Sequence, residues 1–340
     1  MGQNVVGVVG GGSWGTAIAQ ILGDNGHTVR FWMRDAEVCR AINQTRRNSK
    51  YLPQAILAPQ IIATTELASI GPSCRVIFLV VPSHGLRAVA RELGDHLDGA
   101  HILIHAVKGI EPGTYKLMSQ ILREETCCRK IGVLSGPNLA KEVALHHPSA
   151  TAIASRFAEV IEAGRNLLWC HGFRVYGNDD VVGTEIGGSA KNVMAIAAGM
   201  AQGLGFGMNT MALLLTRGLT EIARLGLAKG ADAQTFQGLS GIGDLMATCF
   251  SPLSRNYQIG WRLAKGEALP DILSGMTQVA EGVRTTRTLH ELARTIPIYM
   301  PITAGVYRIL FEKEAPKDVL ESLLDVTRNV YEFESAATIK

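Results

Sequence analysis

This sequence of 340 residues has no basic block and no cysteine pair spaced as CxxC. Its 33 Lys plus Arg stand against 30 Asp plus Glu, and none of them form a basic arm. Nucleic-acid binders carry clustered basic residues, so we expect no nucleic-acid partner. The 6 cysteines lack the spacing of a zinc site or redox dithiol, and no other ligand cluster suggests a metal. Free thiols in a reducing compartment are therefore expected.

Targeting signals are also missing. The N-terminus has no charged region followed by a long apolar segment, and Val6 stands where myristoylation requires Ser or Thr. The uncharged run from Val193 to Leu215 is long enough to cross a membrane, but four glycines interrupt it. We interpret the run as a buried helix, a "GLGFGMNT" loop and the start of a second helix. A cytoplasmic protein without a membrane span is expected.

Short β-branched runs alternate with helical stretches from Asn4 to about Asn178, as in "VVGVV", "RVIFLVV" and "KIGVLSG". This alternation predicts βαβ units in a doubly wound, mostly parallel sheet. Beyond about Asp180 the β-branched runs stop, and Ala, Leu, Gly and Met recur at helical spacing. We therefore expect an α/β domain over residues 1–180 and an all-helical domain over 181–340. The natural ligand site is a cleft between them.

Glycines dominate the first predicted turn. Gly10, Gly12 and Gly15 fit the pattern G-x-G-x-x-G directly after "VVGVV" and at the start of a helix. The first glycine permits the tight turn, the second admits a pyrophosphate, and the third lets the helix lie close on the strand. The helix N-terminus then offers unsatisfied NH groups to the phosphates. The pattern predicts a Rossmann-type fold that binds a dinucleotide.

The choice of coenzyme depends on the end of the second predicted strand, about twenty residues beyond the motif. An acidic residue there binds the ribose of NAD(H), whereas an arginine suits the 2′-phosphate of NADP(H). Arg34 favours NADP(H), and the adjacent Asp35 leaves NAD(H) open. The alternative for Arg34 is a solvated loop charge.

One lysine stands out in the helical half. Lys191 and Asn192 interrupt an apolar, small-residue helix at the domain junction. Burying an ammonium is costly unless it is paired, and burial moves its pKa toward the range useful for acid–base catalysis. Asp244, among glycines and apolar residues in "LSGIGDLMATC", is the predicted partner. The alternative is a lysine whose stem packs while its ammonium reaches water.

Further polar groups follow predicted strands or precede helices. Lys108 lies at the carboxyl end of the strand "AHILIHAV", beside the crevice where open α/β sheets bind ligands. Gly136 ends the next strand in a turn. In "SPLSRNYQIG", Ser254, Arg255 and Asn256 form a compact set of donors suited to a phosphate. The alternative for these residues is a helix N-cap next to a surface arginine.

Taken together, these segments resemble the NAD(P)-dependent glycerol-3-phosphate dehydrogenases of bacteria over nearly the whole chain. The motifs that carry the resemblance are "GGGSWGTA", "YLP", "VPSH", "AVKGIE", "SGPNLAKEV", "GGSAKNVMAIAAG", "LSGIGDLMATC", "SPLSRNYQIG" and "VAEGVRTT". The resemblance implies reversible reduction of dihydroxyacetone phosphate to sn-glycerol 3-phosphate, which supplies phospholipid synthesis in the cytoplasm. It implies no metal.

The resemblance also assigns roles to residues. Lys191 is implied as the catalytic acid/base. The implied substrate contacts are Lys108, Gly136, Asn138, Asp244, Ser254, Arg255 and Asn256. Besides the motif glycines, the implied coenzyme contacts are Ser13, Trp14, Arg34, Tyr51, Lys108, Ala140, Arg255, Val279 and Glu281. Asn138 replaces the hydroxyl residue of many members, which leaves its contact open.

Two other functions remain as alternatives. A β-hydroxyacid dehydrogenase of the 6-phosphogluconate type shares the architecture, but its helix lysine is followed four positions later by asparagine, where this chain has Ala195. A non-catalytic NADP(H) sensor has no need of Lys191 and Asp244 in an apolar setting. The sequence leaves open whether the chain forms a homodimer.

Overall fold

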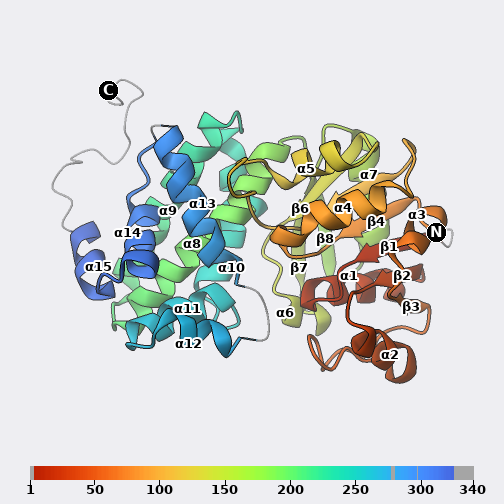
Figure 1. The fold of residues 1–340 in the computed structure, drawn as a ribbon, viewed down its shortest axis with the longest axis horizontal. Helices are drawn as coiled ribbons and strands as arrows, with labels where there is room; N and C mark the ends of the chain where they lie inside the picture. The colour runs from red at the N-terminus through yellow and green to blue at the C-terminus, as the bar shows by residue number, and fades with distance from the viewer. Residues whose placement is uncertain (1–3, 277–279, 297, 325–340) are drawn as a thin grey trace.

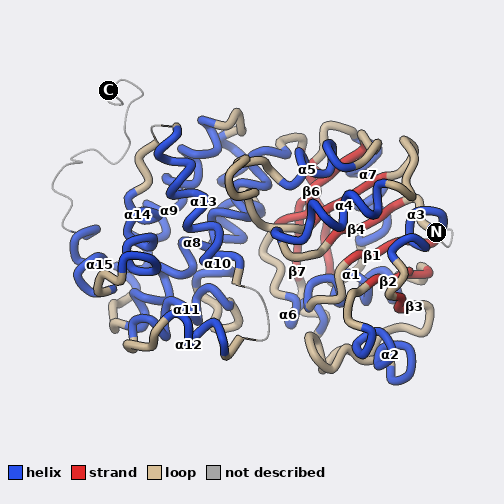
Figure 2. Tube along the Cα trace, in the orientation of Figure 1, coloured by secondary structure: helices blue, strands red, loops and turns tan. Residues whose placement is uncertain are grey.

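The computed structural model describes residues 4–276, 280–296 and 298–324. Figure 1 shows two lobes, one built around a sheet and one built from helices. Figure 2 shows that every strand lies in the first lobe. The part of the chain described after Asn178 contains no strand, and α8 begins at Val181, so strands give way to helices between these residues. The domain boundary at 180/181 itself stays a prediction.

Eight strands form one sheet in the order β3-β2-β1-β4-β5-β6-β7-β8. All neighbouring pairs are parallel except β6 and β7. This arrangement confirms the doubly wound, mostly parallel α/β fold with a helical C-terminal part. The strands are β1 (Val5–Val9), β2 (Thr28–Trp32), β3 (Ile61–Thr64), β4 (Val76–Leu79), β5 (Ile102–His105), β6 (Lys130–Ser135), β7 (Ser149–Ala154) and β8 (Phe173–Asn178).

Helices cover both faces of this sheet, which explains why its central strands are almost continuously apolar. On one face α1, α2, α6 and α7 contribute to a buried apolar cluster, and on the other α3, α4 and α5 do so. Their bounds are α1 (Ser13–Asp24), α2 (Ala36–Thr45), α3 (Ile70–Ser73), α4 (Leu86–Gly94), α5 (Met118–Glu125), α6 (Ala140–Ala144) and α7 (Ala158–Leu168), with short 3₁₀ turns η1 (Leu67–Ser69) and η2 (Ser83–Gly85).

The helical lobe surrounds α8, a helix of 23 residues that is buried along nearly its whole length. It ends at Gly203 and α9 begins at Met208, which confirms the predicted helix, loop and helix. In the described ranges no helix has both the length and the apolar character needed to cross a membrane. The elements are α8 (Val181–Gly203), α9 (Met208–Ala228), η3 (Ala233–Gln237), η4 (Leu239–Gly243), α10 (Asp244–Cys249), α11 (Arg255–Ala264), α12 (Leu269–Ser274), α13 (Glu281–Thr295), α14 (Pro301–Tyr307), η5 (Arg308–Glu312) and α15 (Pro316–Leu324).

Two glycines let α8 and α11 cross in close contact. A Cβ at Gly199 would lie 2.0 Å from the carbonyl oxygen of Tyr257, and a Cβ at Gly260 would lie 1.9 Å from that of Ile196. Real side chains do not fit at these distances, so only glycine permits this approach. The crossing fixes α11, which begins at Arg255, relative to the turn of α8 that carries Lys191.

We expect Gly199→Ala to lower the free energy of unfolding by about 2–3 kcal/mol, because the added methyl group forces the two helices apart. Urea unfolding followed by circular dichroism measures the change. Gly99→Ala is the matched control, since Gly99 is exposed and nothing lies within 4 Å of a Cβ there. Equal stability of the two variants would contradict the tight crossing.

Candidate functional site

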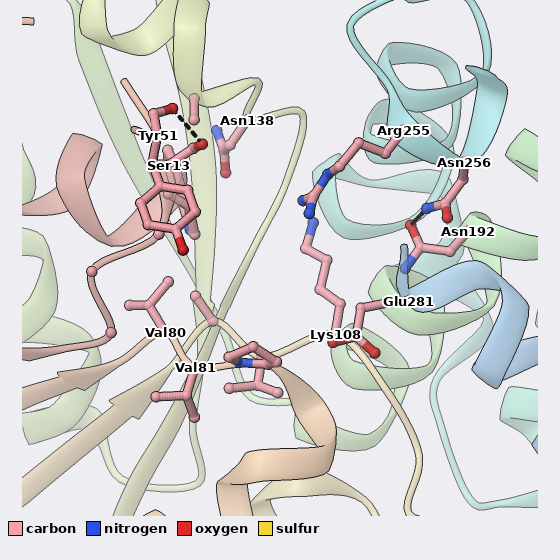
Figure 3. Close-up of a pocket in the computed structure, with 18 of the residues that line it drawn as sticks. Ser13, Tyr51, Val80, Val81, Lys108, Asn138, Asn192, Arg255, Asn256 and Glu281 are labelled. Carbon is pink, nitrogen blue, oxygen red and sulfur yellow. Dashed lines mark hydrogen bonds between the residues drawn. The ribbon is translucent and has the colours of Figure 1, made fainter. Parts of the chain in front are cut away.

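A cleft of about 890 Å³ lies between the two lobes, next to the carboxyl ends of the central strands. Its wall comes from the glycine loop, the ends of β2, β4, β5 and β6, and helices α8, α10 and α11 (Figure 3). In open α/β sheets this is the position where ligands bind. The volume lies within the range of about 300–1,000 Å³ typical of small-molecule sites.

The cleft brings together most of the predicted site residues. Those on its wall are Gly10, Gly12, Ser13, Trp14, Arg34, Tyr51, Lys108, Asn138, Ala140, Lys191, Ser254, Arg255, Asn256 and Glu281. Three others, Gly15, Gly136 and Asp244, are buried and do not form part of that wall. Val279 lies outside the described residues. The functional roles assigned to all these residues stay predictions.

The glycine loop is shaped by close backbone contacts. Gly10 has φ +128°, a backbone conformation that residues other than glycine rarely adopt. A Cβ at Gly15 would lie only 1.8 Å from the carbonyl oxygen of Gly10. The loop therefore leaves room for backbone NH groups at the start of α1 to meet a pyrophosphate, which is the fit expected for a dinucleotide.

A second segment, Asn48–Tyr51, packs on this loop. Buried Asn48 donates through Nδ2 to the carbonyl oxygen of Gly11 at 2.9 Å and to Oγ1 of Thr16 at 2.8 Å. The hydroxyl of Ser13 donates to the carbonyl oxygen of Tyr51 at 2.7 Å (Figure 3). These bonds hold residues 48–51 next to the glycine loop, and Tyr51 is on the cleft wall.

The end of β2 carries the predicted determinants of coenzyme choice. Arg34 is exposed on the cleft wall. Asp35 caps α2, because its Oδ1 accepts from the backbone NH groups of Glu37 and Val38 at 3.0 and 3.2 Å. Its Oδ2 forms an ion pair with Lys50 at 2.7 Å. Asp35 was the reason why the sequence did not exclude NAD(H) as the coenzyme. Both oxygens of its carboxylate have partners within the protein.

Two lysines share one buried carboxylate at the centre of the site. Lys191 on α8 and Lys108 after β5 each form an ion pair with Asp244, one to Oδ1 and the other to Oδ2. The Asp244 side chain is 2% exposed, whereas Lys108 is 22% exposed and Lys191 is 7% exposed. The predicted pairing of Lys191 with Asp244 is thus present. Both lysines lie on the cleft wall in front of the carboxylate.

The surroundings of Lys191 set its protonation. Burial lowers the pKa of the Lys191 ammonium below its usual value, the negative charge of Asp244 opposes this shift, and the positive charge of Lys108 adds to it. An ammonium with a lowered pKa gives up and recovers its proton more readily near neutral pH. Such a group suits proton transfer to a ligand in the cleft.

Thr248 is a site residue that the sequence analysis missed. Lys191 donates to its hydroxyl oxygen at 2.5 Å, and that hydroxyl donates to the carbonyl oxygen of Asp244 at 2.7 Å. The available signal was helical spacing, because Thr248 follows Asp244 by four residues and so lies on the same face of α10. The lysine ammonium is thereby held between a carboxylate and a hydroxyl.

The start of α11 lies next to the turn of α8 that carries Lys191. Ser254 caps this helix, because its hydroxyl oxygen accepts from the backbone NH of Tyr257 at 3.3 Å. Asn256 donates to Oδ1 of Asn192 at 2.9 Å (Figure 3) and accepts from the backbone NH of Gly282 at 3.0 Å. The capping alternative for Ser254 is therefore present. Arg255 and Lys108 point into the same space between the lobes (Figure 3).

Asn138 occupies the sheet side of the cleft. Its Nδ2 donates to the carbonyl oxygen of Ala150 at 2.8 Å, which fixes the amide. Its Oδ1 has no hydrogen-bond partner among the residues that the structure describes. An acceptor so placed is available to a donor group on a ligand. Within the same residues, no group of three or more His, Cys, Asp or Glu side chains is arranged to hold a metal ion.

A carboxylate bridges the two lobes beside the cleft. Glu281, the first residue of α13, accepts from the backbone NH of Ser83 at 2.9 Å and from its hydroxyl at 2.6 Å. Ser83 begins the turn that follows β4. The sequence analysis missed this partner, since the two residues are 198 positions apart.

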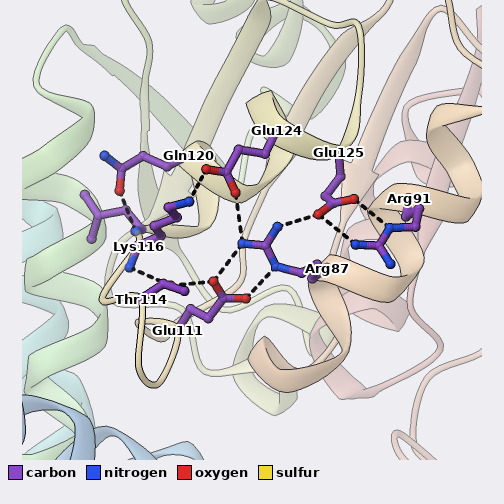
Figure 4. A network of polar contacts seen from close by, with 9 residues as sticks. Arg87, Arg91, Glu111, Thr114, Lys116, Gln120, Glu124 and Glu125 are labelled. Atoms are coloured by element: carbon purple, nitrogen blue, oxygen red, sulfur yellow. Dashed lines mark hydrogen bonds and ion pairs between the residues drawn. The ribbon is translucent and has the colours of Figure 1, made fainter.

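The loop that carries Lys108 is held from both sides. Arg87 on α4 donates to both carboxylate oxygens of Glu111 at 2.7 Å and also contacts Glu124 and Glu125, within the ionic network of Figure 4. The hydroxyl of Ser189 on α8 donates to the carbonyl oxygen of Gly109 at 3.3 Å. Two apolar side chains of the loop, Ile110 and Leu117, belong to the buried cluster of the helical lobe.

Comparison with known proteins gives a consistent result. Residues 5–160 match the family described as NAD-dependent glycerol-3-phosphate dehydrogenase N-terminus, and residues 180–321 match the corresponding C-terminus. A glycerol-3-phosphate dehydrogenase (NAD(P)+) from Pseudomonas fluorescens is 45% identical over 95% of this chain and 94% of its own length. One from Azotobacter vinelandii is 46% identical over 94% of each chain. The crystal structure of glycerol-3-phosphate dehydrogenase from Coxiella burnetii superposes with a TM-score of 0.92 at 34% identity, covering 95% of this chain and 99% of the other.

Proposed function

Because this chain belongs to the family of NAD-dependent glycerol-3-phosphate dehydrogenases, we propose how its cleft reduces dihydroxyacetone phosphate to sn-glycerol 3-phosphate. The chain is an oxidoreductase that uses a nicotinamide coenzyme. The observation that carries the mechanism is the pair of lysines on one buried carboxylate, which share the wall of the cleft with Ser254, Arg255 and Asn256. Neither the 6-phosphogluconate type nor a non-catalytic sensor is favoured by the relatives.

The coenzyme is assigned to the sheet side of the cleft. The loop of Gly10, Gly12 and Gly15 fits a pyrophosphate, because close backbone contacts exclude a side chain at Gly10 and Gly15 and the space next to Gly12 is open. When bound, the reduced nicotinamide supplies a hydride to the ketone carbon of the substrate. Arg34 at the end of β2 supports a preference for NADP(H), with NAD(H) as the second coenzyme.

Lys191 is the proposed acid/base. Negative charge develops on the ketone oxygen as the hydride arrives, and the Lys191 ammonium stabilises that oxygen and protonates it. In the reverse direction the neutral amine takes the proton back from the alcohol. Asp244 and Thr248 keep the amine in place, since each binds it from inside the protein. Lys108 adds a second positive charge next to the reacting carbonyl.

The start of α11 is the proposed phosphate site. Arg255 offers a planar guanidinium for bidentate binding, and Ser254 and Asn256 add polar groups at the same end of the helix. Asn138 and Gly136 lie on the sheet side, where they complete the substrate pocket. Binding energy from the non-reacting phosphate thus fixes the ketone against the nicotinamide ring.

The cellular role follows from the product. We assign the enzyme to the cytoplasm and to the supply of sn-glycerol 3-phosphate for phospholipid synthesis. We propose that the chain forms a homodimer. Light scattering of the purified chain tests this assembly.

The direct test is oxidation of NADPH by the purified chain, followed by its absorbance. Dihydroxyacetone phosphate is expected to start the absorbance decrease. In the oxidative direction, 6-phosphogluconate with NADP+ is expected to give no reduction. NADPH binding without turnover would support a sensor, and turnover of 6-phosphogluconate would support the alternative enzyme.

Arg255→Ala is expected to raise the KM for dihydroxyacetone phosphate about 30-fold, because a charge-assisted bond contributes about 2 kcal/mol, with a smaller change in kcat. Steady-state kinetics at saturating coenzyme measures the split. Lys265→Ala is the matched control, since this exposed lysine follows the other end of α11. An unchanged KM in the Arg255 variant would remove this residue from the phosphate site.

A further inference from the structure

We propose that Lys50, together with Arg34, forms a subsite for the 2′-phosphate of NADP(H) and thereby sets coenzyme selectivity. This inference rests on the proposed function and deepens it. Arg34 alone stands at the sequence position where such a phosphate is expected. Lys50 lies 16 positions further along the chain and reaches the same place only through the fold.

The fold places Lys50 next to the glycine loop. Asn48 and the carbonyl oxygen of Tyr51 are hydrogen-bonded to the glycine loop and the first turn of α1, so residue 50 is held beside the loop that fits the pyrophosphate. The adenosine ribose of a dinucleotide lies between that loop and the end of the second strand. The Lys50 ammonium lies in this region, because it is 2.7 Å from Oδ2 of Asp35. Asp35 follows Met33, the residue directly after β2, by two positions.

The carboxylate of Asp35 is already paired within the protein. An unpaired carboxylate at this position accepts a hydrogen bond from the 2′-hydroxyl of NAD(H). Here two backbone NH groups bind one oxygen and Lys50 binds the other. The hydrogen bond from Lys50 is the largest of the effects that lower the pKa of Asp35, so the carboxylate stays ionised and paired. Lys50 thus neutralises the carboxylate and uses one of the two lone pairs on Oδ2, which weakens Asp35 as an acceptor for the ribose hydroxyl of NAD(H).

The charge of Arg34 and Lys50 and their remaining hydrogen-bond donors suit a phosphate. Arg34 and Lys50 supply two cations against the one carboxylate of Asp35, so the group is net positive. A lysine ammonium has three donors, and the Asp35 bond uses one of them. A phosphate monoester carries a charge of about −1.5 to −2 at neutral pH and offers three acceptor oxygens. The guanidinium of Arg34 suits such a group by its fork geometry.

The experiment compares both coenzymes in Lys50→Gln. We expect kcat/KM for NADPH to fall about 10-fold, less than for Arg255, because the Lys50 side chain is 49% exposed and solvent weakens its charge-assisted bond. The value for NADH is expected to stay constant or rise, because Asp35 loses the positive charge that neutralises it. The matched control is Arg47→Gln, since exposed Arg47 is on the same segment but donates to the carbonyl oxygen of Pro53 at 3.0 Å. It is expected to leave both values unchanged.

Binding of 2′,5′-ADP by calorimetry tests the subsite without turnover. Lys50→Gln is expected to weaken 2′,5′-ADP about 10-fold and to leave ADP unchanged. An equal loss with NADPH and NADH, or an unchanged affinity for 2′,5′-ADP, would overturn the inference. Failure of the proposed function is a different result, in which the unmodified chain turns over dihydroxyacetone phosphate with neither coenzyme.

Discussion

Lys191→Met is expected to lower kcat about 10³-fold or more, while NADPH binds as before. The variant removes both the proton donor and the positive charge that faces the ketone oxygen, and each effect is typically worth about 10²-fold or more. Methionine keeps the apolar stem of the buried side chain, so the helix is expected to retain its packing. Single-turnover kinetics measures the chemical step, and fluorescence of bound NADPH measures coenzyme affinity.

The matched control for this experiment is Lys141→Met. Lys141 is on the wall of the same cleft but is exposed. We expect its kcat to change less than threefold, since no role in the chemistry is assigned to it. If the Lys191 variant kept its kcat, the acid/base would have to be another group, with Lys108 as the nearest cation.

Asp244→Asn is expected to damage both stability and catalysis. The carboxylate is the buried counterion of two lysines, and removing one partner of a buried ion pair typically costs about 3–5 kcal/mol. The variant also shifts the pH profile. Because Asp244 raises the pKa of Lys191 against the effect of burial, its loss lowers that pKa further. The protonated donor is then lost at lower pH, so the basic limb of kcat moves to lower pH.

Urea unfolding and the pH dependence of kcat together test this prediction. Asp271→Asn is the matched control, because Asp271 is an exposed carboxylate in the first turn of α12. It is expected to change the free energy of unfolding by less than about 0.5 kcal/mol and to leave the pH profile in place. A basic limb that stays in place in the Asp244 variant would show that Lys191 is not the titrating group.

The sequence predicted the parts of this fold that depend on local pattern. Strand β1, the glycine loop and α1 follow from an apolar run that meets Gly10, Gly12 and Gly15. The pairing of Lys191 with Asp244 followed from the cost of burying either charge alone. Strand β3 (Ile61–Thr64) was missed, because it is a short edge strand with little apolar sequence on either side, whereas the equally short β4 and β5 lie inside longer apolar runs.

Contacts between distant segments gave no comparable signal. Lys50 reaches Asp35 because buried Asn48 fastens its segment to the glycine loop, and no periodic pattern marks that bond. Glu281 was implied as a coenzyme contact by resemblance, but its bonds to Ser83 depend on how the two lobes pack. Contacts that depend on tertiary packing can therefore be identified only in the folded structure, even when each side chain is chemically conspicuous in the sequence.

The loop from Gly109 to Leu117 belongs by sequence to the sheet domain, yet Ile110 and Leu117 complete the apolar core of the helical one. The helical half expressed by itself would therefore lack part of its interior, and the sheet half would expose these two side chains. Unfolding should accordingly be a single cooperative transition. A chimera can join the sheet half of one relative to the helical half of another. Its loop from Gly109 to Leu117 must then match the helical half as well as α8 does, or the core of the helical half will contain a void.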